Sequence, residues 1–362
     1  MLSSSKVALR KEYRLCKHCL ERHFGAAGRP SDPCYICRGL MHSLDVISNS
    51  ILAAAKDYQF ETFLIGATLP AQVYEREDTM RARLKIRGTE NIKNHMTRKL
   101  GACFAQLTGT RVEYAKPDLR ITLTVDKENK VGIGVIPRPL TLAGTYIKKS
   151  RGLPQRQKKC TQCSGNGCNY CNYSGLAGYE SVEGVIAKEI LRLTGGQVPK
   201  FTWFGSEDRT SLVLGGGRPF YVRIFNPKKR TLRKKTIKGK DITATLHVMD
   251  GQPHIQPRFT VKTKIHIKCK NNVSKEKLNI LRSLSGSPVN FENKSKITEK
   301  WISSVHFRQV ESNQFILTII ADGGLMIKQF VGGEQYMKPN ISEILGDKCE
   351  CIAFDILDVK LQ

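Results

Sequence analysis

Long apolar runs are absent from this sequence. No stretch reaches the eighteen or more apolar residues that a membrane-spanning helix needs, and Met1–Lys6 lacks the apolar segment of a secretory signal. The apolar fraction of 40% is that of an ordinary soluble protein, and 362 residues are enough for two or three domains. We therefore expect a multidomain cytoplasmic protein that does not enter a membrane.

Acidic residues are scarce relative to basic ones. The chain has 32 Asp and Glu against 59 Lys and Arg, which gives a formal net charge of +27. This excess is far larger than solubility requires, and it favours a polyanion held through many contacts between basic side chains and phosphates. A halophilic protein would carry the opposite sign, and a basic amphipathic helix for binding anionic membranes is missing. Nucleic acid is therefore the first partner to consider.

Cysteines, in contrast, are numerous and regularly spaced. Eight of the twelve fall into Cys-x-x-Cys pairs, and in a reducing compartment this spacing indicates zinc, because two such thiolates reach two corners of a tetrahedron. Disulfides are the weaker alternative. The pairs combine into a ribbon with C-x2-C-x14-C-x2-C spacing and a knuckle with C-x2-C-x4-C-x2-C spacing, namely Cys16, Cys19, Cys34 and Cys37, and Cys160, Cys163, Cys168 and Cys171.

Both cysteine sets are predicted to be structural, because four thiolates around one ion leave no open position for water. His18 and His23 are spare ligand candidates beside the ribbon. The remaining cysteines form no such set and are interpreted as small apolar residues, namely Cys103, Cys269, Cys349 and Cys351.

Hydrophobic periodicity predicts an α+β protein in four regions. These are the zinc ribbon at 1–42, a small α/β domain at 43–150, a knuckle linker at 151–178 and a larger α+β domain at 179–362. In the small domain the patterns indicate a strand at 60–65, a helix from Ile92 that stops at Thr108-Gly109, and paired strands at 119–125 and 131–136.

The larger domain combines apolar alternation with dense positive charge. Its patterns indicate a helix over 182–193, a further helix over 275–284, and strands at 315–321 and 351–359. A strand at 259–269 alternates between a core face and a basic face that includes Lys262 and Lys264. The cationic segment 228–240 is either a solvated loop or a contact to a nucleic-acid backbone.

A lone Asp, Asp208, stands just before a glycine-rich strand entry at Leu214–Phe220. Backbone without Cβ atoms lets another chain approach closely, so this Asp is a candidate nucleophile or base. The alternative is a turn Asp that hydrogen-bonds its own backbone.

Several motifs together resemble the archaeal Pus-ten class of tRNA pseudouridine synthases. They occur in the order of that family and span essentially the whole chain. They are the Cys16 to Cys37 ribbon, Ser150–Gln155, the four-cysteine knuckle, Ser181–Glu183, Gly205-x-Glu207-Asp208, Leu214-Gly215-x-Gly217-Arg218-Pro219-Phe220, Ile327-Lys328-x-Phe330-Val331 and Lys338–Asn340. The Gly-Arg-Pro-Phe and knuckle motifs are specific to this resemblance.

The resemblance implies a pseudouridine synthase fold preceded by a zinc-containing, THUMP-like accessory domain that holds tRNA. The implied targets are uridines 54 and 55 in the TΨC arm, with no organic cofactor and no obligatory protein partner. The family's catalytic Asp corresponds to Asp208, and its basic partner residue corresponds to Lys328, for which a surface strand lysine is the alternative. A carboxylate can act as a covalent nucleophile, and a uridine must leave its stack to reach one.

The chain also departs from the family pattern. Ser206, Thr210 and Leu212 replace family residues around the Asp motif, and Met326 stands where the family has a tyrosine expected to stack on the flipped base. Met can pack against a ring but has no proton to exchange. The candidate substrate-binding residues are therefore Met326, the possible substitutes Tyr221 and Tyr336, Arg218 of the Gly-Arg-Pro-Phe motif, and the strand lysines Lys262 and Lys264.

Two other functional classes remain alternatives. One is a tRNA-binding or tRNA-folding protein on the same fold, which would bind with steep salt dependence and leave uridine unchanged. The other starts from Cys160–Gly167, which looks like one repeat of the Hsp40 (DnaJ) cochaperones. Those proteins carry several such repeats and a His-Pro-Asp motif, which this sequence lacks.

Overall fold

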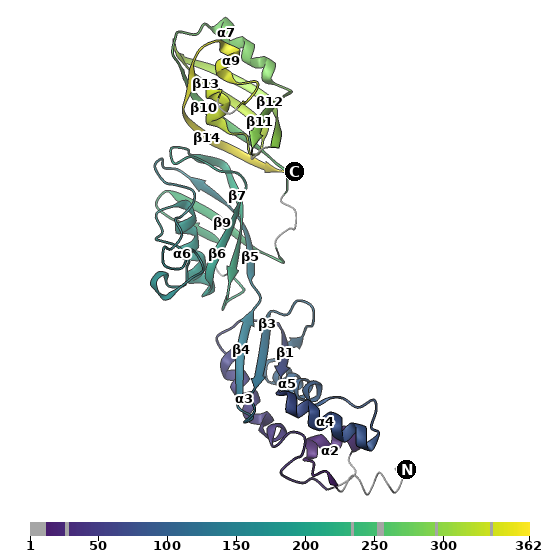
Figure 1. Cartoon of the computed structure of the whole chain (residues 1–362). Helices are drawn as coiled ribbons and strands as arrows, with labels where there is room; N and C mark the ends of the chain where they lie inside the picture. Colours follow the sequence, from purple (N-terminus) through teal and green to yellow (C-terminus); the bar gives the residue numbers. More distant parts are fainter. Residues whose placement is uncertain (1–11, 26–28, 233–234, 252–256, 294–295, 334–335) are drawn as a thin grey trace. The chain divides into compact units, whose positions relative to one another are not determined.

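The computed structural model describes residues 12–25, 29–232, 235–251, 257–293, 296–333 and 336–362. They belong to two compact units, which we call unit 1 (residues 1–138 and 226–230) and unit 2 (residues 139–225 and 231–362; Figure 1). No helix among the described residues is both long and apolar enough to cross a membrane.

The division between the units differs from the expected boundary at residue 150. Strand β5 (Leu140–Lys148) pairs along its whole length with strands of unit 2, so these residues leave the small domain. Lys148 is buried at the end of this strand. The boundary between the units is set by the pairing of β5 with β7 and β9, which lie far along the chain. Local composition does not indicate such pairing.

Unit 1 is a four-stranded sheet with helices, in the order β2-β1-β3-β4. Strand β1 is parallel to both of its neighbours, and β3 and β4 are antiparallel. The strands are β1 (Thr62–Thr68), β2 (Arg111–Val112), β3 (Leu119–Val125) and β4 (Val131–Pro137), and the helices are α2 (Lys17–Phe24), η1 (Leu40–Ser43), α3 (Leu44–Ala55), α4 (Ala71–Leu84) and α5 (Ile92–Thr108).

The predicted helix and strands of unit 1 are confirmed, and their ends have visible causes. The Asn91 side chain accepts a hydrogen bond from the Asn94 N–H at the start of α5, and Gly109 ends the helix in the left-handed region. The sequence pattern did not reveal α4, because its buried face contains Glu77 among the apolar residues Val73, Met80 and Leu84. A charged residue on the inner face breaks the apolar stripe by which such a helix is recognised.

Unit 2 is built around a ten-stranded sheet in the order β11-β12-β13-β10-β14-β7-β5-β9-β8, with β6 added on β7. Its neighbours are antiparallel except β14 and β7, which meet in parallel through one pair of residues, Ile356 and Val213. The remaining strands are β6 (Gln197–Trp203), β7 (Val213–Phe225), β8 (Thr236–Lys238), β9 (Ile242–Met249), β10 (Phe259–Cys269), β11 (Ser287–Asn293), β12 (Lys296–Glu311), β13 (Gln314–Asp322) and β14 (Cys349–Leu361).

One hydrophobic core cluster contains residues from most strands of this sheet and from the helices of unit 2. The predicted helix over 182–193 is confirmed as α6 (Val182–Thr194), capped by the Ser181 hydroxyl. The segment 275–284 forms a short α7 (Lys275–Asn279) followed by a 3-10 turn, η3 (Ile280–Leu284). Two further short helices, α8 (Ile327–Gly332) and α9 (Ile341–Leu345), bury apolar side chains in the same core.

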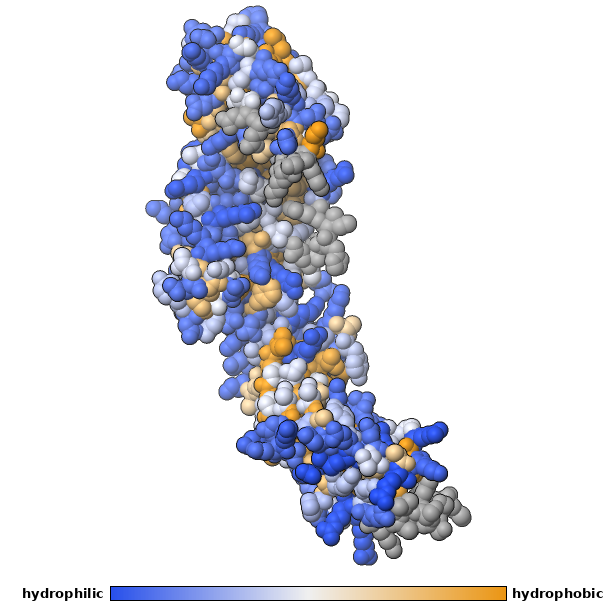
Figure 2. Space-filling view, viewed as in Figure 1, coloured by the Kyte–Doolittle hydropathy of each residue, from blue (hydrophilic) through white to orange (hydrophobic). Residues whose placement is uncertain are grey.

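The outer surfaces of both units are predominantly hydrophilic in the view of Figure 2, with hydrophobic residues in small separate patches. The predicted alternation of β10 is confirmed, since Ile265, Ile267 and Cys269 are buried while Lys262 and Lys268 are exposed. Most of the cationic segment 228–240 is described, but residues 233 and 234 lie outside the described ranges.

Candidate active site

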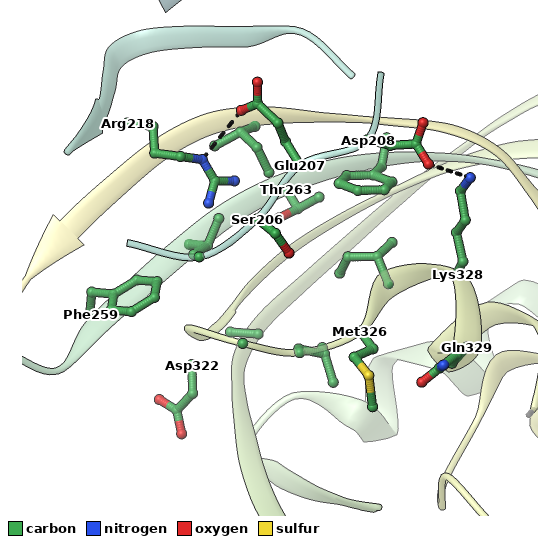
Figure 3. Close-up of a pocket in the computed structure, with 18 residues that line it drawn as sticks. Ser206, Glu207, Asp208, Arg218, Phe259, Thr263, Asp322, Met326, Lys328 and Gln329 are labelled. Atoms are coloured by element: carbon green, nitrogen blue, oxygen red, sulfur yellow. Dashed lines mark ion pairs between the residues drawn. The ribbon is translucent and has the colours of Figure 1, made fainter. Parts of the chain in front are cut away.

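Unit 2 contains a cavity of about 310 Å³ beside Asp208 (Figure 3). Five parts of the chain converge on it: the loop 205–208, Arg218 of β7, one face of β10, the segment from the end of β13 into α8, and the middle of β14. Its walls are mostly apolar, and its polar groups come mainly from the loop and α8. Lining residues include Gly205, Ser206, Glu207, Asp208, Arg218, Phe259, Val261, Thr263, Asp322, Leu325, Met326, Lys328 and Phe354.

Asp208 and Lys328 form an ion pair at the edge of this cavity. Asp208 Oδ2 lies 2.5 Å from Lys328 Nζ, and Oδ1 accepts hydrogen bonds from the Thr210 N–H and hydroxyl. The hydrogen bond from Lys328 holds the pKa of Asp208 below its usual value, against the opposing effect of burial. Asp208 in turn raises the pKa of Lys328. The carboxylate is therefore ionised at neutral pH, as a nucleophile must be.

Two glycines give the cavity its shape. Gly205 has φ +82°, and a Cβ there would lie 2.6 Å from Nη1 of Arg218. A Cβ at Gly323 would overlap the ring of Phe259. These positions need residues without side chains because the loop and the strand end approach their neighbours so closely.

The segment 150–155 holds the Asp208 loop in place, which explains why this motif accompanies the Asp motif in sequence. Gly152 N–H donates to the Arg209 carbonyl, and the Arg209 side chain returns hydrogen bonds to the Gly152 carbonyl. Arg151 binds Asp355 on β14 through two hydrogen bonds of 2.7 and 2.9 Å, and Asp355 also accepts from the Leu212 N–H. The loop is thereby tied to both a neighbouring loop and the sheet.

Some of the predicted substrate-binding residues line the cavity, and others lie outside it. Met326 and Arg218 line the cavity, although Arg218 is almost fully buried and turns toward Glu207 (Figure 3). Tyr221 is buried in a separate cluster, where it meets Phe204 edge to face. Tyr336 is 85% exposed and lies outside the cavity lining. Whether any of these residues binds substrate stays a prediction.

Lys262 and Lys264 also lie away from the cavity. They alternate along β10 with Val261 and Thr263, which do line it. Because successive side chains of a strand point to opposite faces, the two lysines are on the other face of the sheet. They can contact an extended polyanion there but not a group inside the cavity.

Two residues of the site were missed by sequence reasoning. Phe259 lines the cavity with its ring and packs edge to face on Phe204, but in the sequence it is one more apolar residue of an alternating strand. Glu207 was noted only as the neighbour of Asp208, and its side chain is fully buried. The available signal was a carboxylate directly beside the candidate nucleophile in a strongly basic chain.

The ribbon cysteines come together in unit 1 as a group able to hold a metal ion. The sulfur atoms of Cys16, Cys19, Cys34 and Cys37 all lie within 4.8 Å of one another, and Cys16 Sγ is 3.6 Å from Cys37 Sγ. Sulfurs at the corners of a tetrahedron with metal bonds of about 2.3 Å are separated by about 3.8 Å. All four residues are buried in the hydrophobic core, so the donor set and the spacing both fit a closed structural site.

The knuckle cysteines form a second such group in unit 2. Cys163 Sγ and Cys168 Sγ each lie 3.8 Å from Cys171 Sγ, again close to the tetrahedral spacing. Backbone N–H groups of Gly167 and Gly175 donate to Cys163 Sγ and Cys171 Sγ. Such hydrogen bonds favour thiolates, the form that binds metal.

His18 and His23 belong to neither metal group. His23 instead hydrogen-bonds Glu77 and Thr89. Outside both groups, Cys269 and Cys349 lie side by side on β10 and β14, with 2.8 Å between their sulfur atoms.

Comparison with known proteins agrees with this geometry. The model of the family described as "Pus10, C-terminal" matches residues 141–360, and that of the "Pus10 THUMP domain, archaeal" matches residues 47–124. The first match covers more than half of the chain and contains the cavity, the knuckle and both members of the Asp208–Lys328 pair. The pseudouridine synthase fold and the THUMP-like accessory domain are thereby confirmed.

Relatives match over nearly their whole length. The tRNA pseudouridine synthase Pus10 of Nitrosopumilus maritimus is 33% identical, covering 97% of this chain and 96% of the relative. That of Pyrococcus furiosus is 26% identical, covering 96% and 95%. A solved Cbf5-Nop10-Gar1 complex matches 59% of this chain and 48% of that chain with a TM-score of 0.33 and 8% identity, too low to add to the argument. On the family model and the full-length relatives, this chain belongs to the Pus10 family of tRNA pseudouridine synthases.

Proposed function

We propose that this protein isomerises uridine to pseudouridine in the TΨC arm of tRNA, at position 54, 55 or both, with Asp208 as the nucleophile. The observation that carries the proposal is the ionised Asp208 carboxylate, paired with Lys328 at 2.5 Å on the edge of a mostly apolar cavity. The reaction is an isomerisation: the bond from N1 to C1′ breaks, the base turns, and a bond from C5 to C1′ forms. The hydrogen on C5 is lost and a proton ends on N1, so no cofactor is consumed.

The cavity has the size and the walls for a flipped nucleobase. Its volume of about 310 Å³ lies at the lower end of the range of about 300–1,000 Å³ for small-molecule sites. The ring of Phe259 and the thioether of Met326 offer apolar surfaces to a base that has left its stack. The hydrogen bond from Lys328 keeps the Asp208 carboxylate charged at the edge of the cavity.

The positive charge of the chain supports tRNA as the polyanion. With a net charge of +27, binding should weaken steeply with salt, because each neutralised phosphate releases counterions. We propose zinc as the ion in both cysteine groups, since four thiolates in tetrahedral spacing suit it and leave no position open for chemistry. The ions then stabilise the fold and take no part in the reaction.

A second candidate function is tRNA binding without isomerisation. Met326 is the observation that favours it, because the family tyrosine at this position is missing and neither Tyr221 nor Tyr336 lines the cavity. In that case the cavity would accept a base, and no group with an exchangeable proton would stack on it.

The deciding experiment incubates the purified protein with an unmodified archaeal tRNA transcript. Pseudouridine is mapped by carbodiimide adducts and primer extension for the parent, for Asp208→Asn, and for the control Asp347→Asn. Asp347 is a carboxylate of unit 2 that hydrogen-bonds Asn271 outside the cavity. We expect modification in the TΨC arm by the parent and the control and none by Asp208→Asn. Tight binding with unmodified uridine in all three would favour the second candidate.

A further inference from the structure

Glu207 lies at the centre of a buried charged cluster beneath the Asp208 loop. Its side chain has no exposed surface, and it points away from Asp208 toward the interior (Figure 3). Lys148 Nζ lies 3.1 Å from its Oε1, the Tyr146 hydroxyl donates to Oε2 at 2.7 Å, and Arg218 Nε lies 3.4 Å from Oε2. Each of these three partners is also buried.

The protonation states of the cluster agree with this arrangement. Burial and the charge of Glu207 raise the pKa of Tyr146, so its hydroxyl stays protonated and donates to the carboxylate. Gln155 in turn donates to the Tyr146 hydroxyl, which completes the hydrogen bonds of that group. Burial lowers the pKa of Lys148, whereas Glu207 opposes that change.

Stability alone does not account for so much buried charge. Removing two ions from water costs several kcal/mol for each, and well-packed apolar residues of similar volume are often as stable or more so. A buried charged cluster is better explained when it holds a segment of the chain in one geometry. The other hydrogen bonds of Lys148 and Arg218 identify that segment.

Lys148 and Arg218 also donate hydrogen bonds to the backbone on both sides of Glu207. Lys148 Nζ donates to the main-chain carbonyl of Asp208 at 3.2 Å and to that of Leu153 at 3.0 Å. Arg218 Nη1 donates to the carbonyl of Phe204 at 2.7 Å. Glu207 thus holds two side chains that clamp the loop at residues 204 and 208, directly at the proposed nucleophile.

We propose that Glu207 is a positioning residue for Asp208: through Lys148 and Arg218 it fixes the backbone from which the carboxylate reaches the substrate. The inference rests on the proposed function of Asp208. A displacement of about 1 Å at a reacting group can cost about a hundredfold in rate. Loss of the clamp should therefore appear in catalysis, although Glu207 itself is sealed from the RNA.

The test compares Glu207→Gln with a matched control, Glu183→Gln. Glu183 is a half-buried carboxylate in the first turn of α6 that accepts a hydrogen bond from the Gln157 N–H, and it is not among the residues that line the cavity. We expect Glu207→Gln to lower kcat about a hundredfold with tRNA affinity within twofold of the parent. We expect Glu183→Gln to keep the parent kcat. Glu207→Asp, which retains the charge, should recover part of the lost rate.

A second measurement separates this inference from the proposed function. Amide hydrogen exchange of residues 205–212 should be faster in Glu207→Gln than in the parent and unchanged in Glu183→Gln, whether or not the protein is active. Unchanged exchange, or a parent-like kcat in Glu207→Gln, would overturn the positioning role. Faster exchange in a protein whose parent makes no pseudouridine would instead refute the proposed reaction and, with it, the catalytic purpose of the clamp.

Discussion

Each unit buries a carboxylate next to basic side chains, but the two carboxylates connect different parts of the structure. In unit 1, Glu77 pairs with Arg22 at 2.7 Å, binds His23, and accepts from the Ile92 N–H at the start of α5. In unit 2, Glu207 is surrounded by Lys148, Tyr146 and Arg218 beside the cavity. The first carboxylate joins three helices, whereas the second lies in the loop that carries the proposed nucleophile.

The cysteine groups show the same contrast. The ribbon of unit 1 lies inside the hydrophobic core, while the knuckle of unit 2 is partly exposed and is not part of the unit's main core cluster. We therefore expect the stability of unit 1 to depend on a metal ion at the ribbon more strongly than that of unit 2 depends on one at the knuckle, because the ribbon cysteines are part of the core of unit 1. The predictions below test this difference.

The largest effect is expected from the ribbon. Structural zinc contributes about 10–16 kcal/mol of binding free energy to the fold that holds it. Cys37→Ser should therefore abolish the calorimetric unfolding transition of unit 1, and Cys168→Ser should leave the main transition of unit 2 in place. Each variant should lose one of two bound metal ions. Cys103→Ser, which removes a thiol outside both groups, should keep both ions. Equal losses of unfolding free energy in the ribbon and knuckle variants would contradict the contrast.

Glu77→Gln should cost about 3–5 kcal/mol in the free energy of unfolding of unit 1, because it leaves the buried Arg22 without its partner. Burial alone would raise the pKa of Glu77, but His23 and Arg22 lower it overall, which shows that the carboxylate is charged. The measurement is denaturant unfolding together with kcat at saturating tRNA. We expect kcat to stay at the parent value. A hundredfold fall in kcat would mean that Glu77 affects catalysis as Glu207 is proposed to, and the contrast between the two carboxylates would be lost.

Lys328→Met should lower kcat and shift its pH dependence. The hydrogen bond from Lys328 depresses the pKa of Asp208, so the parent carboxylate stays charged until the pH falls below about 3.9, the value for an unperturbed Asp. The stability from this pair is present above that unfolded-state pKa and is lost as pH falls through the lower folded-state pKa. Without Lys328, only the hydrogen bonds from Thr210 oppose the effect of burial, so the pKa of Asp208 rises relative to the parent.

A pH-rate profile checks this prediction. The acid limb of Lys328→Met should move to higher pH than that of the parent, while Lys338→Met, a change to an exposed lysine, should leave it in place. Identical acid limbs in parent and Lys328→Met would show that the pair does not control the ionisation of Asp208.

The smallest effects are expected for the two tyrosines outside the cavity. Tyr221→Phe keeps the ring that packs on Phe204, and Tyr336→Ala changes an exposed side chain, so each should alter kcat less than twofold. Single-turnover rates with the tRNA transcript measure this. A large loss in either variant would mean that the tyrosine moves into the site when RNA binds and substitutes for Met326.

The sequence by itself determined the features that depend on short spacing. Thiolates with two residues between them predict a metal group in any fold, Gly109 marks a helix end, and Asp208 stands out as an Asp beside a glycine-rich loop in a basic chain. These signals are local, because a few neighbouring residues set the backbone geometry.

Only the tertiary structure shows which distant residues surround Asp208 and which strands pair with β5. Lys148 was expected in the small domain and Phe259 in an ordinary strand, yet folding brings the first to the Asp208 carbonyl and the second to the cavity beside Asp208. Glu207 was noted only as the neighbour of Asp208, and folding buries its side chain. The division at residue 138 likewise follows from the pairing of β5 with β7 and β9. Such contacts join residues far apart in the chain through strand register and burial, and neither can be read from composition or periodicity.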